Sequence, residues 1–142
     1  MSQAFFLDTN IFIYAQDNTD LAKQKIANNL IREALISSQG VISSQVVQEF
    51  CNVASTKYVQ SIKTHDLKEY LRVTLGRLWQ HAPSLDFYYR AVELFERDTL
   101  SFYDTLIIQA ALDLGCHKLY SEDLQSGRKF GNLVIVNPFS HS

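Results

Sequence analysis

Short apolar runs alternate along the chain with longer stretches in which apolar residues recur every three or four positions. Ala4–Leu7 is an unbroken apolar run that stops at Asp8, and three further short runs follow at Val41–Ser43, His117–Ser121 and Leu133–Val136. Apolar runs without polar alternation are typical of strands that are buried on both faces of a sheet. We therefore predict four short strands, spread from one end of the chain to the other.

The stretches between these strands have helical spacing. Helices are predicted to begin at residue 11, at Asp20 (ending near Ser38), at Ser44, at Thr64 (ending at Trp79), at Asp86 (ending at Arg97) and at Phe102 (ending at Leu114). Gly40 and Gly115 are expected to end two of them. A polar loop is predicted over Glu122–Asn132. Strands separated by helices indicate an α/β fold with a parallel sheet of four to five strands and helices on both faces.

Composition narrows the class of protein. The chain has 142 residues, of which 46% are hydrophobic and 20% charged, which suits a single globular domain over residues 1–142. Thirteen basic residues against 15 acidic ones leave a net charge of −2, which excludes a strongly basic nucleic-acid clamp. Cys51 and Cys116 are too few for a disulfide framework, and no run is long enough for a membrane span. We expect a cytoplasmic protein without a membrane association.

Four acidic residues fall where one edge of such a sheet is expected. Asp8 directly follows the first strand, and Asp123 comes just after the third. Glu49 lies in the second turn of the helix after the second strand, and Asp104 in the first turn of the last helix. Ligands of open parallel sheets bind outside the carboxyl ends of the strands. The four acids are therefore predicted to share one edge.

Each acid taken alone has a purely structural explanation, except for Glu49. Asp8 suits a helix N-cap, Asp104 with Ser101 resembles a capping box, and Asp123 suits a turn. Glu49 lies at the border of an apolar stripe, where an unpaired carboxylate is costly. Four clustered carboxylates repel one another, and a divalent cation removes this repulsion. Oxygen ligands without His or Cys select Mg²⁺ or Mn²⁺, which can hold a phosphodiester and activate a water for in-line attack.

The motifs LDTN at 7–10, QEF at 48–50, SFYD at 101–104 and SED at 121–123 closely resemble the PIN domain. Among PIN domains, the chain is most similar to the VapC-type ribonuclease toxins of bacterial toxin–antitoxin pairs. The resemblance extends over the whole chain in length, strand order and acidic positions. It implies a Mg²⁺- or Mn²⁺-dependent endoribonuclease that cuts single-stranded regions of structured RNA, an antitoxin protein as partner, and a homodimer.

The resemblance also implies roles for individual residues. Four match the family's metal-binding acids, which are Asp8, Glu49, Asp104 and Asp123. Ser121 matches the hydroxyl residue two positions before the last acid, and Asn10 the polar residue after the first acid. Glu122 stands directly beside Asp123, which leaves open which of the two is the fourth acid.

Some further residues are candidates for contacts with RNA. Arg128 and Lys129 lie in the loop beside the predicted site, where they either contact RNA phosphates or form part of an ordinary solvated loop. Aromatic residues cluster at 87–89 and 102–103. We expect most of them in the core, with one or two able to stack on an unpaired base if they are exposed.

Two other functions are consistent with parts of the pattern. A PIN nuclease that processes RNA without an antitoxin would have the same site, and a small overlapping partner gene would distinguish the toxin from it. A phosphoacceptor receiver domain also binds Mg²⁺ at a sheet edge. It needs a pair of acids near the first strand, whereas Asp8 is followed by Thr9 and Asn10.

Overall fold

A six-stranded sheet forms the centre of the computed structural model, which describes residues 3–56 and 62–140. The strand order is β3-β2-β1-β4-β6-β5, and every neighbouring pair is parallel except β5 and β6, which are antiparallel. The strands are β1 (Phe5–Leu7), β2 (Gly40–Ser43), β3 (Trp79–His81), β4 (Lys118–Tyr120), β5 (Lys129–Phe130) and β6 (Leu133–Val136). The predicted α/β class and the four predicted strands are confirmed.

Two edge strands were not predicted. The helix expected to reach Trp79 ends at Leu78, and Trp79 instead opens β3, which pairs with Ile42 and Ser43 of β2. The loop expected over Glu122–Asn132 contains β5, which pairs with the neighbouring β6. Both strands have at most three residues and lie at the sheet edges, where pairing with a neighbour rather than an apolar run defines them.

The helices lie between the strands, as expected. They are α1 (Thr9–Ala15), α2 (Leu21–Ser37), α3 (Ser44–Thr56), α4 (Thr64–Tyr70), the π-helical turn η1 (Leu71–Leu75), α5 (Gly76–Leu78), α6 (Leu85–Arg97) and α7 (Phe102–Asp113). Side-chain caps begin several of them; for example, Asp20 accepts a hydrogen bond from the Lys23 amide and Ser84 from the Phe87 amide.

Gly40 has a different role from the predicted one. The left-handed residue after α2 is Ser38, with a φ of 59°, whereas Gly40 is already the first residue of β2. A Cβ atom on Gly40 would lie 2.1 Å from the Cβ of Ala34, so the glycine permits close packing of β2 against α2. Gly115 does follow α7 with a φ of 69°, as predicted.

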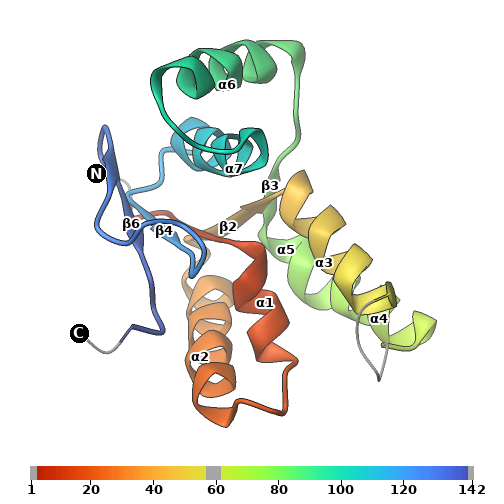
Figure 1. The fold of residues 1–142 in the computed structure, drawn as a ribbon. Coiled ribbons are helices and arrows are strands. Elements are labelled where there is room, and N and C mark those ends of the chain that lie inside the picture. Colours follow the sequence, from red (N-terminus) through yellow and green to blue (C-terminus); the bar gives the residue numbers. More distant parts are fainter. Residues whose placement is uncertain (1–2, 57–61, 141–142) are drawn as a thin grey trace.

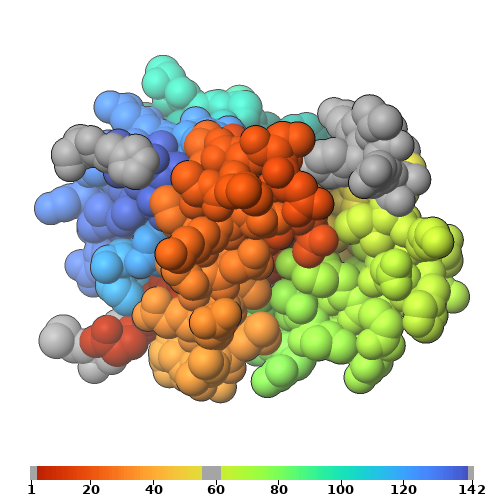
Figure 2. Space-filling view, turned by 90° about the horizontal axis from the view of Figure 1, so that it is seen from below, coloured from red at the N-terminus to blue at the C-terminus, as the bar shows by residue number. Residues whose placement is uncertain are grey.

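Helices cover both faces of the sheet. Figure 1 shows α6 and α7 on one side and α1 and α2 on the other, with α3, α4 and α5 next to them beyond β2. Seen from the side of α1 and α2, these two helices cover the middle of the molecule, between the C-terminal strands and the segment of α4 and α5 (Figure 2). The core contains fully buried side chains from strands and helices, among them Phe6, Leu7, Phe12, Ile42, Ile108, Leu119 and Ile135.

The aromatic residues at the starts of α6 and α7 divide into two groups. Phe87 is buried and Phe102 half-buried, as expected for core residues, but Tyr88, Tyr89 and Tyr103 are exposed. The prediction that most of these five lie in the core is therefore wrong. In the part of the chain that the structure describes, no helix is long and apolar enough to cross a bilayer.

Candidate active site

The candidate site lies where the order of strands in the sheet changes direction relative to the order along the chain. From β1 the chain builds β2 and β3 to one side, and later adds β4 to the other side of β1. Leu7 pairs with Tyr120, so Asp8 and Ser121 follow neighbouring parallel strands, and the Asp8 amide donates to the Tyr120 carbonyl at 3.0 Å. Such a reversal opens a crevice at the carboxyl ends of two strands, which is where open α/β sheets bind ligands.

Asp8 is the most buried of the four acids, with 8% of its surface exposed. Its Oδ1 accepts a hydrogen bond from the Thr9 amide and its Oδ2 accepts one from the Ser121 hydroxyl, each at 2.7 Å. Asp8 therefore caps α1, as its structural explanation predicts, and also faces the candidate site. Its cap role and its position in the site are compatible because the two oxygens have different partners.

Burial raises the pKa of Asp8 from 3.8 to about 6, and the nearby carboxylates of Glu49 and Asp123 add to this increase. The hydrogen bonds from Ser121 and from the Thr9 amide act in the opposite direction but do not outweigh it. Compared with a solvent-exposed aspartate, the site without a cation thus favours the protonated form of Asp8 and holds its proton to a higher pH. A positive charge placed between these acids would reverse that preference.

Thr9 connects Asp8 to Glu49. The buried Thr9 hydroxyl donates to Glu49 Oε1 at 2.7 Å, and its backbone amide donates to Asp8. Thr9 was not among the site residues predicted from the sequence. The signal available was the hydroxyl residue directly after the first acid, but its partner lies 40 positions away on α3.

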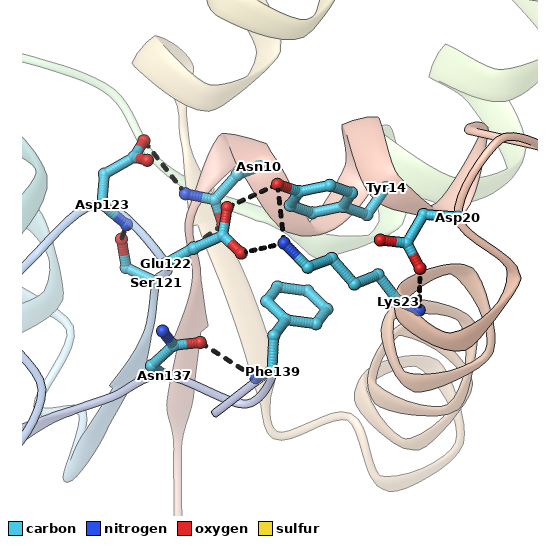
Figure 3. A network of polar contacts seen from close by, with 9 residues as sticks. All are labelled: Asn10, Tyr14, Asp20, Lys23, Ser121, Glu122, Asp123, Asn137 and Phe139. Carbon is cyan, nitrogen blue, oxygen red and sulfur yellow. Dashed lines mark hydrogen bonds and ion pairs between the residues drawn. The ribbon is translucent and has the colours of Figure 1, made fainter. Parts of the chain in front are cut away.

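Asn10 holds the loop that carries the last acid. Its Nδ2 donates to Asp123 Oδ2 at 3.2 Å, and its Oδ1 accepts from the Glu122 amide at 3.4 Å. The Asp123 amide in turn donates to the Ser121 hydroxyl at 3.2 Å. Asn10 therefore joins the segments after β1 and β4, as Figure 3 shows, and Ser121 joins them a second time through its hydrogen bond to Asp8.

Glu122 points away from Asp123 into a different set of contacts (Figure 3). Tyr14 donates to Glu122 Oε1 at 2.5 Å, and Lys23 donates to Glu122 Oε2 at 2.6 Å and to the Tyr14 hydroxyl at 3.2 Å. The Lys23 ammonium also lies 4.5 Å from the centre of the Tyr14 ring. We call these three residues the Glu122 clamp. Of the two adjacent acids, only Asp123 has its carboxylate directed towards Asn10 and Asp8.

The clamp favours a charged Glu122. Burial alone would raise the pKa of Glu122, but the hydrogen bonds from Lys23 and Tyr14 outweigh it and lower the pKa below its ordinary value. The same bond to Glu122 raises the pKa of Lys23. Glu122 and Lys23 thus stay paired at neutral pH, and the clamp connects α1 and α2 to the loop after β4.

Asp104 lies on the other side of the site, in the first turn of α7. Ser101 caps this helix by accepting from the Asp104 amide at 3.1 Å, which is half of the predicted capping box. Gln45 on α3 donates to the Tyr103 carbonyl at 3.1 Å and so joins the starts of α3 and α7, one helical turn before Glu49. The half-buried Asp104 carboxylate has no hydrogen bond or ion pair with another residue that the structure describes.

The side chains of this site are only partly arranged to hold a metal ion. Within residues 3–56 and 62–140, no three carboxylate, imidazole or thiol groups converge closely enough to hold an ion. The donors nevertheless suit a hard divalent cation, since all four are carboxylates and the burial of Asp8 favours a neighbouring positive charge. Binding would therefore require side-chain rotation of Glu49, Asp104 or Asp123. The assignment of the four acids as metal ligands stays a prediction.

The two basic residues predicted to contact RNA differ in their surroundings. Arg128 forms an ion pair with Asp98 at the end of α6, and its guanidinium lies 4.7 Å from the centre of the Phe130 ring. Lys129 is exposed on the edge strand β5. Arg128 is thus engaged in the fold itself, which leaves Lys129 as the more available cation. A contact of either residue with RNA stays a prediction.

Comparison with known proteins identifies the fold. The sequence model of the PIN domain matches residues 5–128. VapC20 from Mycobacterium tuberculosis, a sarcin–ricin-loop-cleaving toxin, is similar with a TM-score of 0.61 and 17% identity, over 84% of this chain and 90% of that one. A toxin–antitoxin complex from Klebsiella pneumoniae gives 0.65 and 20% identity, over 97% and 99% of the two chains. VapBC2 from Rickettsia felis bound to a promoter DNA fragment gives 0.61 and 23%, over 93% and 96%. None of the curated protein sequences matches the chain.

Proposed function

Since this chain belongs to the PIN-domain family, we propose that it is a divalent-metal-dependent endoribonuclease and the toxin of a type II toxin–antitoxin pair. The observation that carries the nuclease proposal is the buried Asp8 carboxylate. Its pKa is raised to about 6 by burial and by the charges of Glu49 and Asp123. A fold that only needed a helix cap would not gather further acids around a buried one.

Asp8, Glu49, Asp104 and Asp123 would hold Mg²⁺ or Mn²⁺ at the carboxyl edge of the sheet. When bound, the ion supplies an activated water and charge stabilisation for phosphodiester hydrolysis. The residues around the acids would set their positions. Ser121 and the Thr9 amide orient Asp8, the Thr9 hydroxyl orients Glu49, and Asn10 orients Asp123. Such second-layer hydrogen bonds fix the direction of ligand oxygens before an ion arrives.

The toxin proposal has a different support. Solved structures of similar fold include a toxin–antitoxin complex and a toxin that cleaves the sarcin–ricin loop, a segment of RNA. These similarities favour an RNA substrate and an antitoxin protein as partner. We further propose that the protein acts in the cytoplasm, as a homodimer and as a single PIN domain over residues 1–142. Lys129, and Arg128 if its pair with Asp98 opens, would contact RNA phosphates near the site.

Cleavage of RNA by the purified protein tests the nuclease proposal. The wild type should cut a structured RNA with Mn²⁺ and fail to do so after chelation with EDTA. Asp8→Asn and Asp104→Asn should both lose cleavage. Metal-independent cutting, or full activity in both variants, would contradict the assigned site.

Expression in bacteria tests the toxin proposal separately. Growth should stop when the wild type is expressed and continue with Asp8→Asn, and co-expression of a small protein encoded next to the gene should restore growth. A cleaving enzyme without growth arrest and without such a neighbouring gene would instead favour the RNA-processing nuclease.

A further inference from the structure

A small pocket lies beside the four acids, between the end of β2, the start of α3 and the starts of α6 and α7. Its volume is about 150 Å³, and its walls include Ser43, Gln45, Gln48, His81, Tyr88 and Tyr103. Sites for drug-sized molecules usually have ~300–1,000 Å³, so this pocket suits one flat ring rather than a whole cofactor. None of its lining residues belongs to the four acids.

The pocket and the acids share the same edge of the sheet. Phe6 pairs with Val41 in parallel register, which places Ser43 at the end of β2 next to Asp8 at the end of β1. Gln45 lies one turn before Glu49 on α3, and consecutive turns of a helix present such residues on one face. Tyr103 directly precedes Asp104. A chain bound at the acids would therefore pass the mouth of the pocket.

The walls combine aromatic surface with an unused amide. Tyr103 is 69% exposed and Tyr88 41% exposed. Phe87 and His81, both lining the pocket, pack against each other edge to face with ring centres 4.5 Å apart. The Gln48 side chain forms no hydrogen bond with another described residue. Exposed tyrosine rings offer faces for stacking and the Gln48 amide offers both donors and an acceptor, so together they suit a flat group with polar edges.

We propose that this pocket binds one unpaired base of the RNA substrate, next to the phosphate that the acids handle. The proposal rests on the nuclease function and names a subsite for it. Tyr103 and Tyr88 would stack on the base, and Gln48 would form hydrogen bonds with its edge. Unpaired bases are recognised in this way, by stacking on aromatic rings and by hydrogen bonds to edges that a duplex would conceal. The pocket therefore selects single-stranded RNA and one base beside the cut.

Base preference at the cut site tests the proposal. The wild type and two variants, Tyr103→Ala and Gln48→Ala, are compared on a library of single-stranded RNA oligonucleotides with all four bases at each position around the cut. Tyr103→Ala should raise KM by about 5- to 100-fold, which is the range for the loss of one stacked base. Gln48→Ala should flatten the base preference at one position only and leave the other positions unchanged.

Tyr89→Ala and Gln80→Ala serve as matched controls. Tyr89 is 58% exposed on α6 but does not line the pocket, and Gln80 is an exposed glutamine on β3 that also lies outside it. Neither control should change KM or base preference. Because all four side chains are exposed, thermal unfolding should be nearly unaffected, and a fold defect is recognised by this measurement. Unchanged KM and base preference in both pocket variants would overturn the proposal.

Two further outcomes separate this proposal from the nuclease proposal. If the wild type cuts no RNA, binding of the same oligonucleotides is measured by fluorescence anisotropy. Weaker binding of Tyr103→Ala than of Tyr89→Ala then supports the pocket while the nuclease function fails, and equal binding overturns both. If the pocket variants cut RNA normally but lose dimerisation or antitoxin binding, the pocket is a protein-docking surface and the base proposal is wrong.

Discussion

The two halves of the candidate site differ in how firmly the fold holds them. On the side of β1 and β4, Asp8 and Asp123 have hydrogen bonds to Ser121, Asn10 and the Thr9 amide. On the side of α3 and α7, Glu49 accepts one hydrogen bond from a described residue, the Thr9 hydroxyl, and the Asp104 carboxylate accepts none from a described residue. The first half is therefore the more firmly held, and under the proposed function it would be organised before a cation binds, whereas the second half has fewer fixed contacts.

This difference explains why the acids share an edge without yet forming a ligand shell. Organising all four carboxylates around an empty centre would place like charges close together in a partly buried site. The fold fixes the acid that is most costly to bury, Asp8, and holds the half-buried acids of the other half, Glu49 and Asp104, by fewer contacts. Under the proposed function, the final arrangement of the four carboxylates would depend on the cation.

The largest effect is expected from removing the carboxylate at the centre of the fixed half. Asp8→Asn should lower the cleavage rate at least ~100-fold, since even second-layer partners of a metal cost about 10–100-fold. Asparagine still caps α1 and places no charge in the buried position, so the melting temperature at neutral pH should not fall. Asp104→Asn should lose as much activity, although it belongs to the open half. Asp86→Asn, an exposed acid at the start of α6, is the control, and an equal loss in this variant would indicate a general charge effect.

A pH titration should distinguish Asp8 from the other acids. In the folded protein its pKa is about 6, against 3.8 in the unfolded chain, so the folded state binds more protons between these values. Its contribution to stability is complete below about pH 4 and is lost as the pH rises through 6, which amounts to ~3 kcal/mol at about 1.4 kcal/mol per pKa unit.

Urea unfolding of the metal-free protein in EDTA, at several pH values between 4 and 7, measures this effect. Asp8→Asn should remove the decrease in the free energy of unfolding, because its amide does not titrate. Saturating Mg²⁺ at pH 7 should restore stability to the wild type. The same decrease in Asp8→Asn would contradict the assignment to Asp8.

A smaller effect is expected from the Glu122 clamp, which supports the fixed half from outside. Glu122→Gln keeps the shape of the side chain but weakens its pair with Lys23, so kcat should fall about 10-fold as Asp123 becomes less well positioned. Glu69→Gln is the matched control, because it removes an equivalent carboxylate from the exposed pair with Arg72. An equal response of the two variants would mean that the clamp does not act on the site.

The smallest effect is expected from substituting two buried serines, Ser121 after β4 and Ser43 at the end of β2. Ser121→Ala removes a hydrogen bond to Asp8 and should lower the free energy of unfolding by ~1–2 kcal/mol. The Ser43 hydroxyl is buried and has no hydrogen-bond partner in the described part of the chain. Ser43→Ala should therefore be neutral or stabilise the protein by ~1 kcal/mol. Opposite signs in thermal unfolding support the comparison, and a loss of stability in Ser43→Ala contradicts it.

Much of the fold could be predicted because its central strands are buried on both faces. Phe5–Leu7 and Leu133–Val136 are recognisable as continuous apolar runs, and the caps Asp20 and Ser101 mark helix starts by local chemistry. The edge strands β3 and β5 were not predicted, because their strand conformation depends on pairing with a neighbouring strand and not on an apolar run of their own. The helix expected to reach Trp79 ended one residue early for the same reason.

In the candidate site, too, one part could be predicted from the sequence and another could not. The four acids could be placed at one edge because each follows, or lies shortly after, a predicted strand or helix start. Their supporting contacts could not, since Thr9 meets Glu49 across 40 positions and Lys23 meets Glu122 across 99. The choice between Glu122 and Asp123 depends on these distant partners, so neighbouring sequence alone left it open.

The central place of β1 has a consequence for how the protein is made. β1 pairs on one side with β4, and the hydrogen bond between Asp8 and Ser121 spans 113 positions of the chain. A ribosome adds about 5–20 residues per second, so roughly 6 to 23 s pass between the synthesis of the two partners. During this interval the nascent chain lacks half of the edge that gathers the acids. The edge therefore first exists only after Ser121 has been synthesised and has left the ribosome.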